Sequence, residues 1–371
     1  MKTLTREDLL DILMGCTILG TGGGGDMTEG IELIDDAFAK GKTFNMISLH
    51  DAPPDALICT PYMLGAISAL PPEEEAAYAR LPRINAPAIL LAYARFQEYL
   101  GQHFFGTVCC ELGGSNTAVA FYAAAMSGHM IIDADPAGRA VPEITHSTYY
   151  LNDLPAAPIV LANEFGEVIL LENVQDDLRA ETLVRALSIV SRNDIAAIDH
   201  ALPIKDIRHA LIPGTVTQAQ TIGHAQREAL ATGADVARAV AQTGGGAVMF
   251  RGEINTSDWR TEDGFTLGSI TISGRDAHAD QTYRINLKNE NLVGWLNDAV
   301  HATIPDLICL IDTDTGLPVS NPDYAVGMRV AVVILPAPAQ FTKERGLAAF
   351  GPAYAGLEQP FTSPLAALND Q

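Results

Sequence analysis

Apolar residues recur at helical spacing on both sides of a glycine-rich segment near the start of the chain. In TREDLLDILMGC three leucines share one helical face, and Thr5 with Asp8 has the spacing of a capping box. After the glycines, Asp26 precedes GIELIDDAFAKGK, whose apolar positions again recur at helical intervals. The pattern predicts two helices joined by the segment GTGGGGD.

The rest of the first half alternates between strand and helix patterns. Apolar runs in ALICT, HFFGTVCCE and HMIIDAD indicate buried strands, whereas APAILLAYARFQEYL and TAVAFYAAAMSG indicate helices. Such alternation is typical of a parallel sheet with helices on its faces. We therefore expect a three-layer α/β domain with a mostly parallel sheet over residues 1–163.

The pattern changes after residue 163. PIVLANEFGEVILLENV predicts two strands around a turn, and the segment 176–242 predicts three helical stretches. Short alternating runs split by turn residues then follow from Gly246 to about Pro336, as in a small barrel or sandwich. We expect residues 164–371 to form a β-barrel-like domain with a helical insert at 176–242. The pattern leaves open which domain the helices pack against.

Composition and charge narrow the class of protein. The 371 residues exceed what one hydrophobic core usually supports, which favours two domains. The formal charge of −22 would repel nucleic-acid phosphates and anionic lipids, so we expect no nucleic-acid partner and no membrane. Five cysteines without paired metal-ligand spacing favour reduced thiols. We expect a cytoplasmic protein with a small-molecule substrate, and a homo-oligomer stays open.

The glycine run, Gly20–Gly25, is the first candidate site. Free backbone N–H groups at the start of a helix suit an anion or an electron-rich heteroatom. The run also matches G-x-G-x-x-G, the dinucleotide fingerprint, although a helix pattern rather than a strand precedes it. The nearest acid after a strand, Asp51, lies well beyond the usual spacing of ~20 residues. A dinucleotide-dependent oxidoreductase and a ligand-free tight turn both remain alternatives.

Acidic residues follow two of the predicted strands. Glu111 and Asp133 stand at strand ends, and Glu143 lies in a loop that two prolines restrict. Converging acids can hold a divalent cation, transfer protons or accept hydrogen bonds from ligand N–H groups. A divalent metal therefore stays open as a cofactor. Cys109 faces the same side as Glu111, but its apolar strand favours packing over a nucleophile.

Two features of the second half carry polar groups. Asp276, His278 and Asp280 share one face of an extended segment, which could grip a metal or form an ordinary polar strand connection. Glu290, flanked by two asparagines at the end of an apolar strand, needs partners if it is buried. We expect Glu290 to reach into the same cleft as Glu111, the alternative being a structural hydrogen-bonding cluster.

Seven motifs in order carry a family resemblance: LGTGGGGD, ELGGSN, DADPAGRAVPE, FRGEI, KNEN, PDLICLIDTDTGLPV and ERGLAAFGPAYAG. With them the chain resembles the S-methyl-thiohydantoin desulfurase-like family over nearly its whole length. The resemblance implies an α/β part followed by a β-barrel part. Ile67 follows Gly65 and Ala66 where the family favours proline, which leaves one pocket wall, and hence the substrate, open.

The resemblance implies a hydrolase that removes sulfur from a thiohydantoin-like ring in hydantoin-related catabolism. Glu111 or Asp133 would be the base for water, Glu143 the acid for the leaving group, and the glycine-run amides would stabilise negative charge. A bound metal could replace the base. A non-catalytic partner of a hydantoinase-type enzyme is the remaining alternative. The ligand-binding candidates are Gly22, Gly23, Gly24, Gly25, Asp26, Gly113, Gly114, Asn116, Arg139, Asn289 and Glu290, with Pro142 also matching the family motif.

Overall fold

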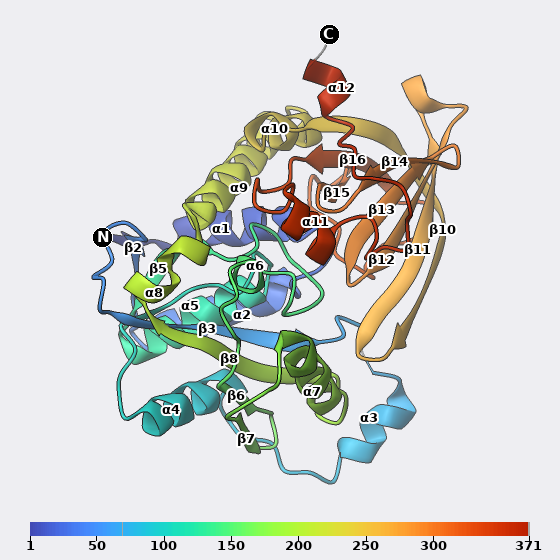
Figure 1. Cartoon of the computed structure of the whole chain (residues 1–371). Helices are drawn as coiled ribbons and strands as arrows, with labels where there is room; N and C mark the ends of the chain where they lie inside the picture. The colour runs from blue at the N-terminus through green and yellow to red at the C-terminus, as the bar shows by residue number, and fades with distance from the viewer. Residues whose placement is uncertain (69, 370–371) are drawn as a thin grey trace.

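The computed structural model describes residues 1–68 and 70–369 and contains two sheets. The first belongs to an α/β part with parallel strands at its centre, and the second is an antiparallel half-barrel, drawn in orange to red in Figure 1. This is the two-part α/β plus β architecture that the sequence predicts. Residues 370–371, the last of the predicted second domain, lie outside the described residues.

The elements of the α/β part follow in chain order. They are β1 (Lys2–Leu4), α1 (Arg6–Leu19), α2 (Met27–Ala39), β2 (Phe44–Ser48), β3 (Leu57–Gly65), α3 (Pro72–Tyr78), α4 (Ala88–Leu100), β4 (Gly106–Thr107), α5 (Asn116–Ser127), β5 (Met130–Asp135), α6 (Thr148–Leu151), β6 (Ile159–Ala162) and β7 (Val168–Leu171). Next come α7 (Asp177–Ile189), β8 (Asp194–Pro203), α8 (Ile204–Ile207), the 3₁₀ turn η1 (Arg208–Ala210), β9 (Ile212–Pro213), α9 (Thr215–Thr232) and α10 (Val236–Thr243).

The half-barrel and the C-terminal segment complete the chain. Their elements are β10 (Ala247–Glu262), β11 (Phe265–Gly274), the 3₁₀ turn η2 (Asp276–His278), β12 (Thr282–Lys288), β13 (Glu290–Leu296), β14 (Ala299–Thr303), β15 (Leu307–Asp312), β16 (Arg329–Leu335), α11 (Glu344–Phe350) and α12 (Ala366–Asn369). No helix in the described part of the chain is both long and apolar enough to span a membrane.

The first sheet is mixed. Its order is β1-β2-β5-β4-β3-β8-β6-β7, with β9 paired to β5. Parallel pairing is confined to β2, β5, β4 and β3, and the strands on either side pair antiparallel. The predicted strand in HFFGTVCCE is reduced to the two residues of β4, and the chain after Thr107 curves toward the glycine run, where the N–H groups of Ser115 and Asn116 donate to the carbonyl of Gly24. This curve brings Glu111 close to that run.

The helices on either side of the glycine run form as the sequence predicts. Thr5 and Asp8 make the capping box of α1, and the Asp26 carboxylate caps α2 by accepting from the N–H of Thr28. Helix α9 lies along α1 (Figure 1). The contact is close because Gly15 and Gly223 face backbone carbonyls where a Cβ would not fit. Helix α9 therefore packs on the α/β part, whereas α10 also contacts β10 and β16.

The segment 176–242 differs from its purely helical prediction. It contains α7, α9 and α10, but between them DIAAIDHALP forms β8, which pairs with β3 and β6. The apolar run of this strand lies buried in the sheet, where tertiary pairing overrides any local helical tendency. The first sheet consequently draws on residues as far as Pro213, beyond the predicted boundary at 163.

The half-barrel has the strand order β14-β13-β12-β11-β10-β16-β15, with every pair antiparallel. Its longest hairpin, β10–β11, reaches toward the α/β part (Figure 1). There Thr266 accepts a hydrogen bond from the N–H of Ser68, and Arg185 of α7 donates to the carbonyl of Gly264. The two sheets thus meet across a shared boundary, and the candidate site lies along it.

Candidate active site

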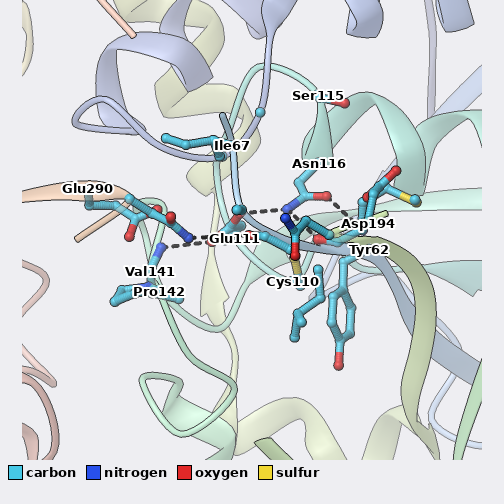
Figure 2. A pocket seen from close by; sticks show the side chains of 18 of the residues that line it. Tyr62, Ile67, Cys110, Glu111, Ser115, Asn116, Val141, Pro142, Asp194 and Glu290 are labelled. Atoms are coloured by element: carbon cyan, nitrogen blue, oxygen red, sulfur yellow. Dashed lines mark hydrogen bonds between the residues drawn. The ribbon is translucent and has the colours of Figure 1, made fainter. Parts of the chain in front are cut away.

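A cavity of about 880 Å³ opens between the α/β part and the half-barrel. The glycine run, the end of β3, the curve after β4 and the loop 136–147 line it from one side. Residues around Glu290 and the loop at 320–323 line it from the other. Figure 2 shows Glu290 of the half-barrel on the same side of Glu111 as Val141, whereas Tyr62 and Asp194 lie on the other side of Glu111. A cavity of this kind at a domain boundary is a usual place for a small-molecule site.

The glycine run is built for close contact with both walls. A Cβ on Gly23 would overlap Glu290 Oε1 and lie 2.6 Å from its Cδ. Gly24 has a φ of +79°, and a Cβ there would overlap the Cα of Gly113. A side chain at Gly23 would displace the Glu290 carboxyl group, and one at Gly24 would displace the curve after β4. The glycines therefore let two parts of the chain meet at one point.

Backbone hydrogen bonds fix the glycine run to the half-barrel. The N–H of Asn291 donates to the carbonyl of Thr21, and the N–H of Asn321 donates to the carbonyl of Gly22, both at 2.8 Å. Helix α1, not a strand, leads into the run, so it lacks the structural context of a dinucleotide fingerprint. The N–H groups of Gly24 and Gly25 have no acceptor among residues 1–68 and 70–369.

Glu111 is buried and well supplied with hydrogen bonds. Its Oε1 accepts from Asn116 Nδ2 and its Oε2 from the N–H of Val141, each at 2.7 Å (Figure 2). Asn116 is itself held by the N–H and carbonyl of Met63. Burial raises the pKa of Glu111, and these donors together with Arg139 oppose that rise. The carboxyl group is therefore oriented at the cavity wall with its charged form partly supported.

Glu290 also lines the cavity, but fewer hydrogen bonds support its carboxyl group. Its side chain is 2% exposed, and its Oε2 has no hydrogen-bond partner within the described residues. Burial raises the pKa of Glu290 well above its ordinary value, and the nearby charge of Glu111 raises it further. Burial without a hydrogen-bond donor to Oε2 thus favours the protonated form of Glu290 more than that of Glu111.

Glu143 also lines the cavity but is tied into an ion pair. Its Oε1 accepts from Lys288 Nζ and from the hydroxyl of Tyr354, the latter at 2.6 Å. Burial acts to raise the pKa of Glu143, but His146, Lys288 and Tyr354 outweigh it and lower the pKa. A carboxylate held in its charged form accepts protons poorly and has none to donate.

Asp133 and the Gly113–Gly114 pair do not line the cavity. The Asp133 carboxylate accepts from the N–H and hydroxyl of Thr217 at the start of α9. Gly113 and Gly114 lie against the glycine run and α1, where a Cβ would overlap neighbouring backbone or crowd Thr17. Asp133 was expected at a free strand end, but α9 covers that edge of the sheet. The predicted shared cleft therefore contains Glu111 and Glu143 without Asp133.

Arg139 is a buried connection between the two parts of the chain. It donates to Thr21 Oγ1 at 2.6 Å and to the carbonyls of Ala140, Pro305 and Asp306 at 2.9 to 3.1 Å. Burial lowers the pKa of Arg139 to about 10. The guanidinium does not line the cavity, so its contacts point to positioning of the glycine run and not to ligand binding.

The other predicted ligand-binding residues lie at the cavity, except Gly23, which packs against Glu290 and does not line it. Gly22, Gly24, Gly25 and Asp26 line it, with Asp26 exposed at the mouth. Asn289 lines it as well, but its Oδ1 accepts from the N–H of Thr266. Among the described residues no three His, Cys, Asp or Glu side chains converge as a metal site, and His278 instead contacts Gln281 and the ring of Phe250.

Several cavity residues carry no signal in the sequence pattern. Tyr62 donates to Asp199 at 2.9 Å, and Asp199 pairs with His200, which stacks on Tyr149. Cys110, not Cys109, lines the cavity, and burial raises the pKa of its thiol well above the ordinary value. Asn321 lines the opposite wall. These residues come from β3, α6, β8 and loops that are far apart in the sequence, so only the fold brings them to the site.

Comparisons with known proteins support the architecture. The model of the S-Me-THD-like N-terminal domain matches residues 7–173, and that of the S-Me-THD-like C-terminal domain matches residues 175–364. A protein from Chromobacterium violaceum, solved by X-ray crystallography, superposes with a TM-score of 0.74 at 22% identity over 98% of this chain and 99% of that chain. At this identity the likeness concerns the fold alone. No curated protein matches the chain.

Proposed function

The chain belongs to the S-Me-THD-like family, and we propose that its cavity hydrolyses the carbon–sulfur bond of a thiohydantoin-like ring. The observation that carries this proposal is the pair of buried carboxyl groups, Glu111 of the α/β part and Glu290 of the half-barrel, that line one cavity. Hydrolysis of such a ring needs a base for water and an acid for the departing sulfur. The environments of the two carboxyl groups differ, and each environment suits one of these two roles.

Hydrogen-bond supply decides which group holds the proton. Glu111 accepts two N–H donors, which favours its ionised form, whereas Glu290 Oε2 has no donor within the described residues. Each charge also disfavours the other, so the pair retains one proton at neutral pH. We therefore assign Glu111 as the general base and Glu290 as the general acid. Glu143, which the sequence suggested as the acid, is held ionised by Lys288 and does not fit that role.

The reaction then follows from these positions. Water adds to the ring carbon that bears sulfur as Glu111 accepts a proton from it. Negative charge develops at the tetrahedral centre, where the N–H groups of Gly24 and Gly25 provide donors without protein acceptors in the described part of the chain. The carbon–sulfur bond breaks as sulfur takes the Glu290 proton. The hydroxyl proton of the tetrahedral centre passes to the departing sulfur of a thione, or to the ring nitrogen of an S-methyl substrate, as the oxo group forms. Transfer of the proton on Glu111 back to Glu290 restores the starting state. The products are the oxo ring and either hydrogen sulfide or, from an S-methyl substrate, methanethiol.

Turnover of simple substrates tests the proposal. The purified chain is incubated in ¹⁸O-water with 2-thiohydantoins and S-methyl-2-thiohydantoins of varied ring substituent, and released sulfide or thiol is measured. We expect release together with one ¹⁸O atom in the oxo ring, because water supplies that oxygen. If the chain releases sulfide or thiol from no substrate of the panel faster than the uncatalysed rate, the proposed function is contradicted.

A further inference from the structure

The side-chain amide of Asn321 has one possible orientation. Asn291 Nδ2 donates to the carbonyl of Ile308 at 2.9 Å, which fixes Asn291 Oδ1 on its other side. Asn321 Nδ2 donates to this Oδ1 at 3.1 Å and to the carbonyl of Asn289 at 2.7 Å. Since a carbonyl oxygen can only accept, the nitrogen of Asn321 must face these groups. The oxygen of the Asn321 amide is therefore directed away from the network that holds it.

That oxygen is buried without a partner at the cavity. Asn321 is 3% exposed and lines the cavity, and its Oδ1 has no hydrogen-bond donor in residues 1–68 and 70–369. The same is true of Glu290 Oε2. Buried polar atoms in native proteins are nearly always paired, so two such atoms in one cavity point to polar groups on a ligand.

The two side chains end over consecutive residues of the glycine run. A Cβ on Gly22 would overlap Asn321 Nδ2 and lie 3.0 Å from Asn321 Oδ1, and a Cβ on Gly23 would overlap Glu290 Oε1, the other oxygen of the carboxyl group whose Oε2 is unpaired. Consecutive Cα atoms are about 3.8 Å apart, so the Asn321 and Glu290 side chains reach the glycine run at adjacent residues. One small ring can therefore contact both of them along a single edge.

We propose that Asn321 and Glu290 together recognise the edge of the substrate ring at which an N–H stands next to the carbon bearing sulfur. Asn321 Oδ1 accepts the ring N–H, and the Glu290 carboxyl group faces the sulfur. This inference rests on the proposed function, because that function supplies the ring and the protonated state of Glu290. It names the substrate class more closely: rings with a free N–H beside the sulfur-bearing carbon are accepted, and rings methylated at that nitrogen are rejected.

The test compares ring N–H with ring N–CH₃ in the wild type, Asn321→Ala and Asn291→Ala. The two asparagines belong to one network, but Asn291 has its oxygen and nitrogen bonded and offers no free acceptor, so it is the matched control. Two measurements are made: kcat/KM for 2-thiohydantoin and its two N-methyl derivatives, and calorimetric binding of hydantoin and its N-methyl derivatives. The binding measurement does not depend on turnover.

We expect the wild type to prefer the N–H ring over one of the N-methyl rings by about 10- to 100-fold, the effect of leaving a buried polar group unpaired. Asn321→Ala should reduce that ratio to near 1. Asn291→Ala should keep the ratio, even if kcat/KM falls for both the N–H ring and the N-methyl ring. An unchanged ratio in Asn321→Ala, or no binding of any hydantoin to the wild type, would overturn the inference. Binding with the expected ratio but without sulfur release would contradict the proposed function alone.

Discussion

Substitution of Gly23 by alanine should disable the site while leaving the fold intact. The Gly23 backbone does not have a positive φ, so alanine is compatible with its conformation. Its Cβ would overlap Glu290 Oε1 and lie 2.6 Å from Cδ and 2.9 Å from Cγ. Ordinary contacts lie at about 3.5–4 Å, so the Glu290 carboxyl group must retreat by roughly 1 Å. A displacement of that size is enough to reduce kcat/KM by about 100-fold.

Gly24→Ala is the matched comparison at the next position. Gly24 has a φ of +79°, and its added Cβ would overlap the Cα of Gly113, which is backbone and cannot move aside as a side chain does. The left-handed conformation alone costs about 1–2 kcal/mol for alanine. We expect Gly24→Ala to lose about 3 kcal/mol or more of unfolding free energy, and Gly23→Ala about 1 kcal/mol, the low end for overpacking.

Urea unfolding and the sulfur-release assay separate the two effects. Gly23→Ala should unfold close to the wild type and show the large loss of kcat/KM, whereas Gly24→Ala should unfold at a clearly lower urea concentration. Wild-type kcat/KM in Gly23→Ala would refute the reasoning, since Glu290 would then have no precise place in catalysis. Equal stability of the two variants would refute the account of the glycine contacts.

Three further predictions concern buried charges. Arg139→Met should lower the unfolding free energy by about 3 kcal/mol in urea unfolding, because it leaves buried carbonyls unpaired. The exposed control Arg345→Met should unfold nearly as the wild type does, because its ion pair with Asp153 lies in solvent. Equal losses in the two variants would contradict the role of Arg139 as a connection. Burial raises the pKa of Asp135 to about 7, so the folded chain keeps this proton at pH values where the unfolded chain has lost it. As the pH rises from about 4 to 7, the unfolding free energy of the wild type should therefore fall relative to that of Asp135→Asn, by up to roughly 4 kcal/mol. A difference in unfolding free energy that does not change with pH would contradict this prediction. Glu143→Gln should reduce kcat/KM less than Glu290→Gln, because Glu143 is already held ionised by Lys288; the opposite order would restore Glu143 as the acid.

Local sequence was sufficient for the parts of the fold that local interactions decide. The capping box of Thr5 and Asp8 and the cap at Asp26 depend on neighbours within three residues, and both form. The strand β8 was missed because its apolar run lies between helices, and only pairing with β3 and β6 makes it a strand. Local periodicity contains no information on such distant partners.

In the candidate site, too, local sequence indicated some residues, whereas distant contacts decided the roles of others. Glu111 with Asn116 and the amide-flanked Glu290 could be found from strand ends and flanking residues, and both lie at the cavity. Thr217 covers Asp133, and Lys288 pairs with Glu143. In each case the two residues lie far apart in the sequence. Those contacts decide which carboxyl groups are available, so the roles of these acids could not be read from their spacing.

The most direct test of the account measures sulfur release by Glu111→Gln, Glu290→Gln and the double variant beside the wild type. Glutamine preserves the shape of each side chain but cannot exchange the proton. We predict that each single variant loses at least about 100-fold in kcat/KM and that the double variant is little worse than either, because the two groups act as one proton-transferring unit. Single variants that retain wild-type release of sulfide or thiol, with unchanged unfolding, would contradict the claim that Glu111 and Glu290 carry the chemistry.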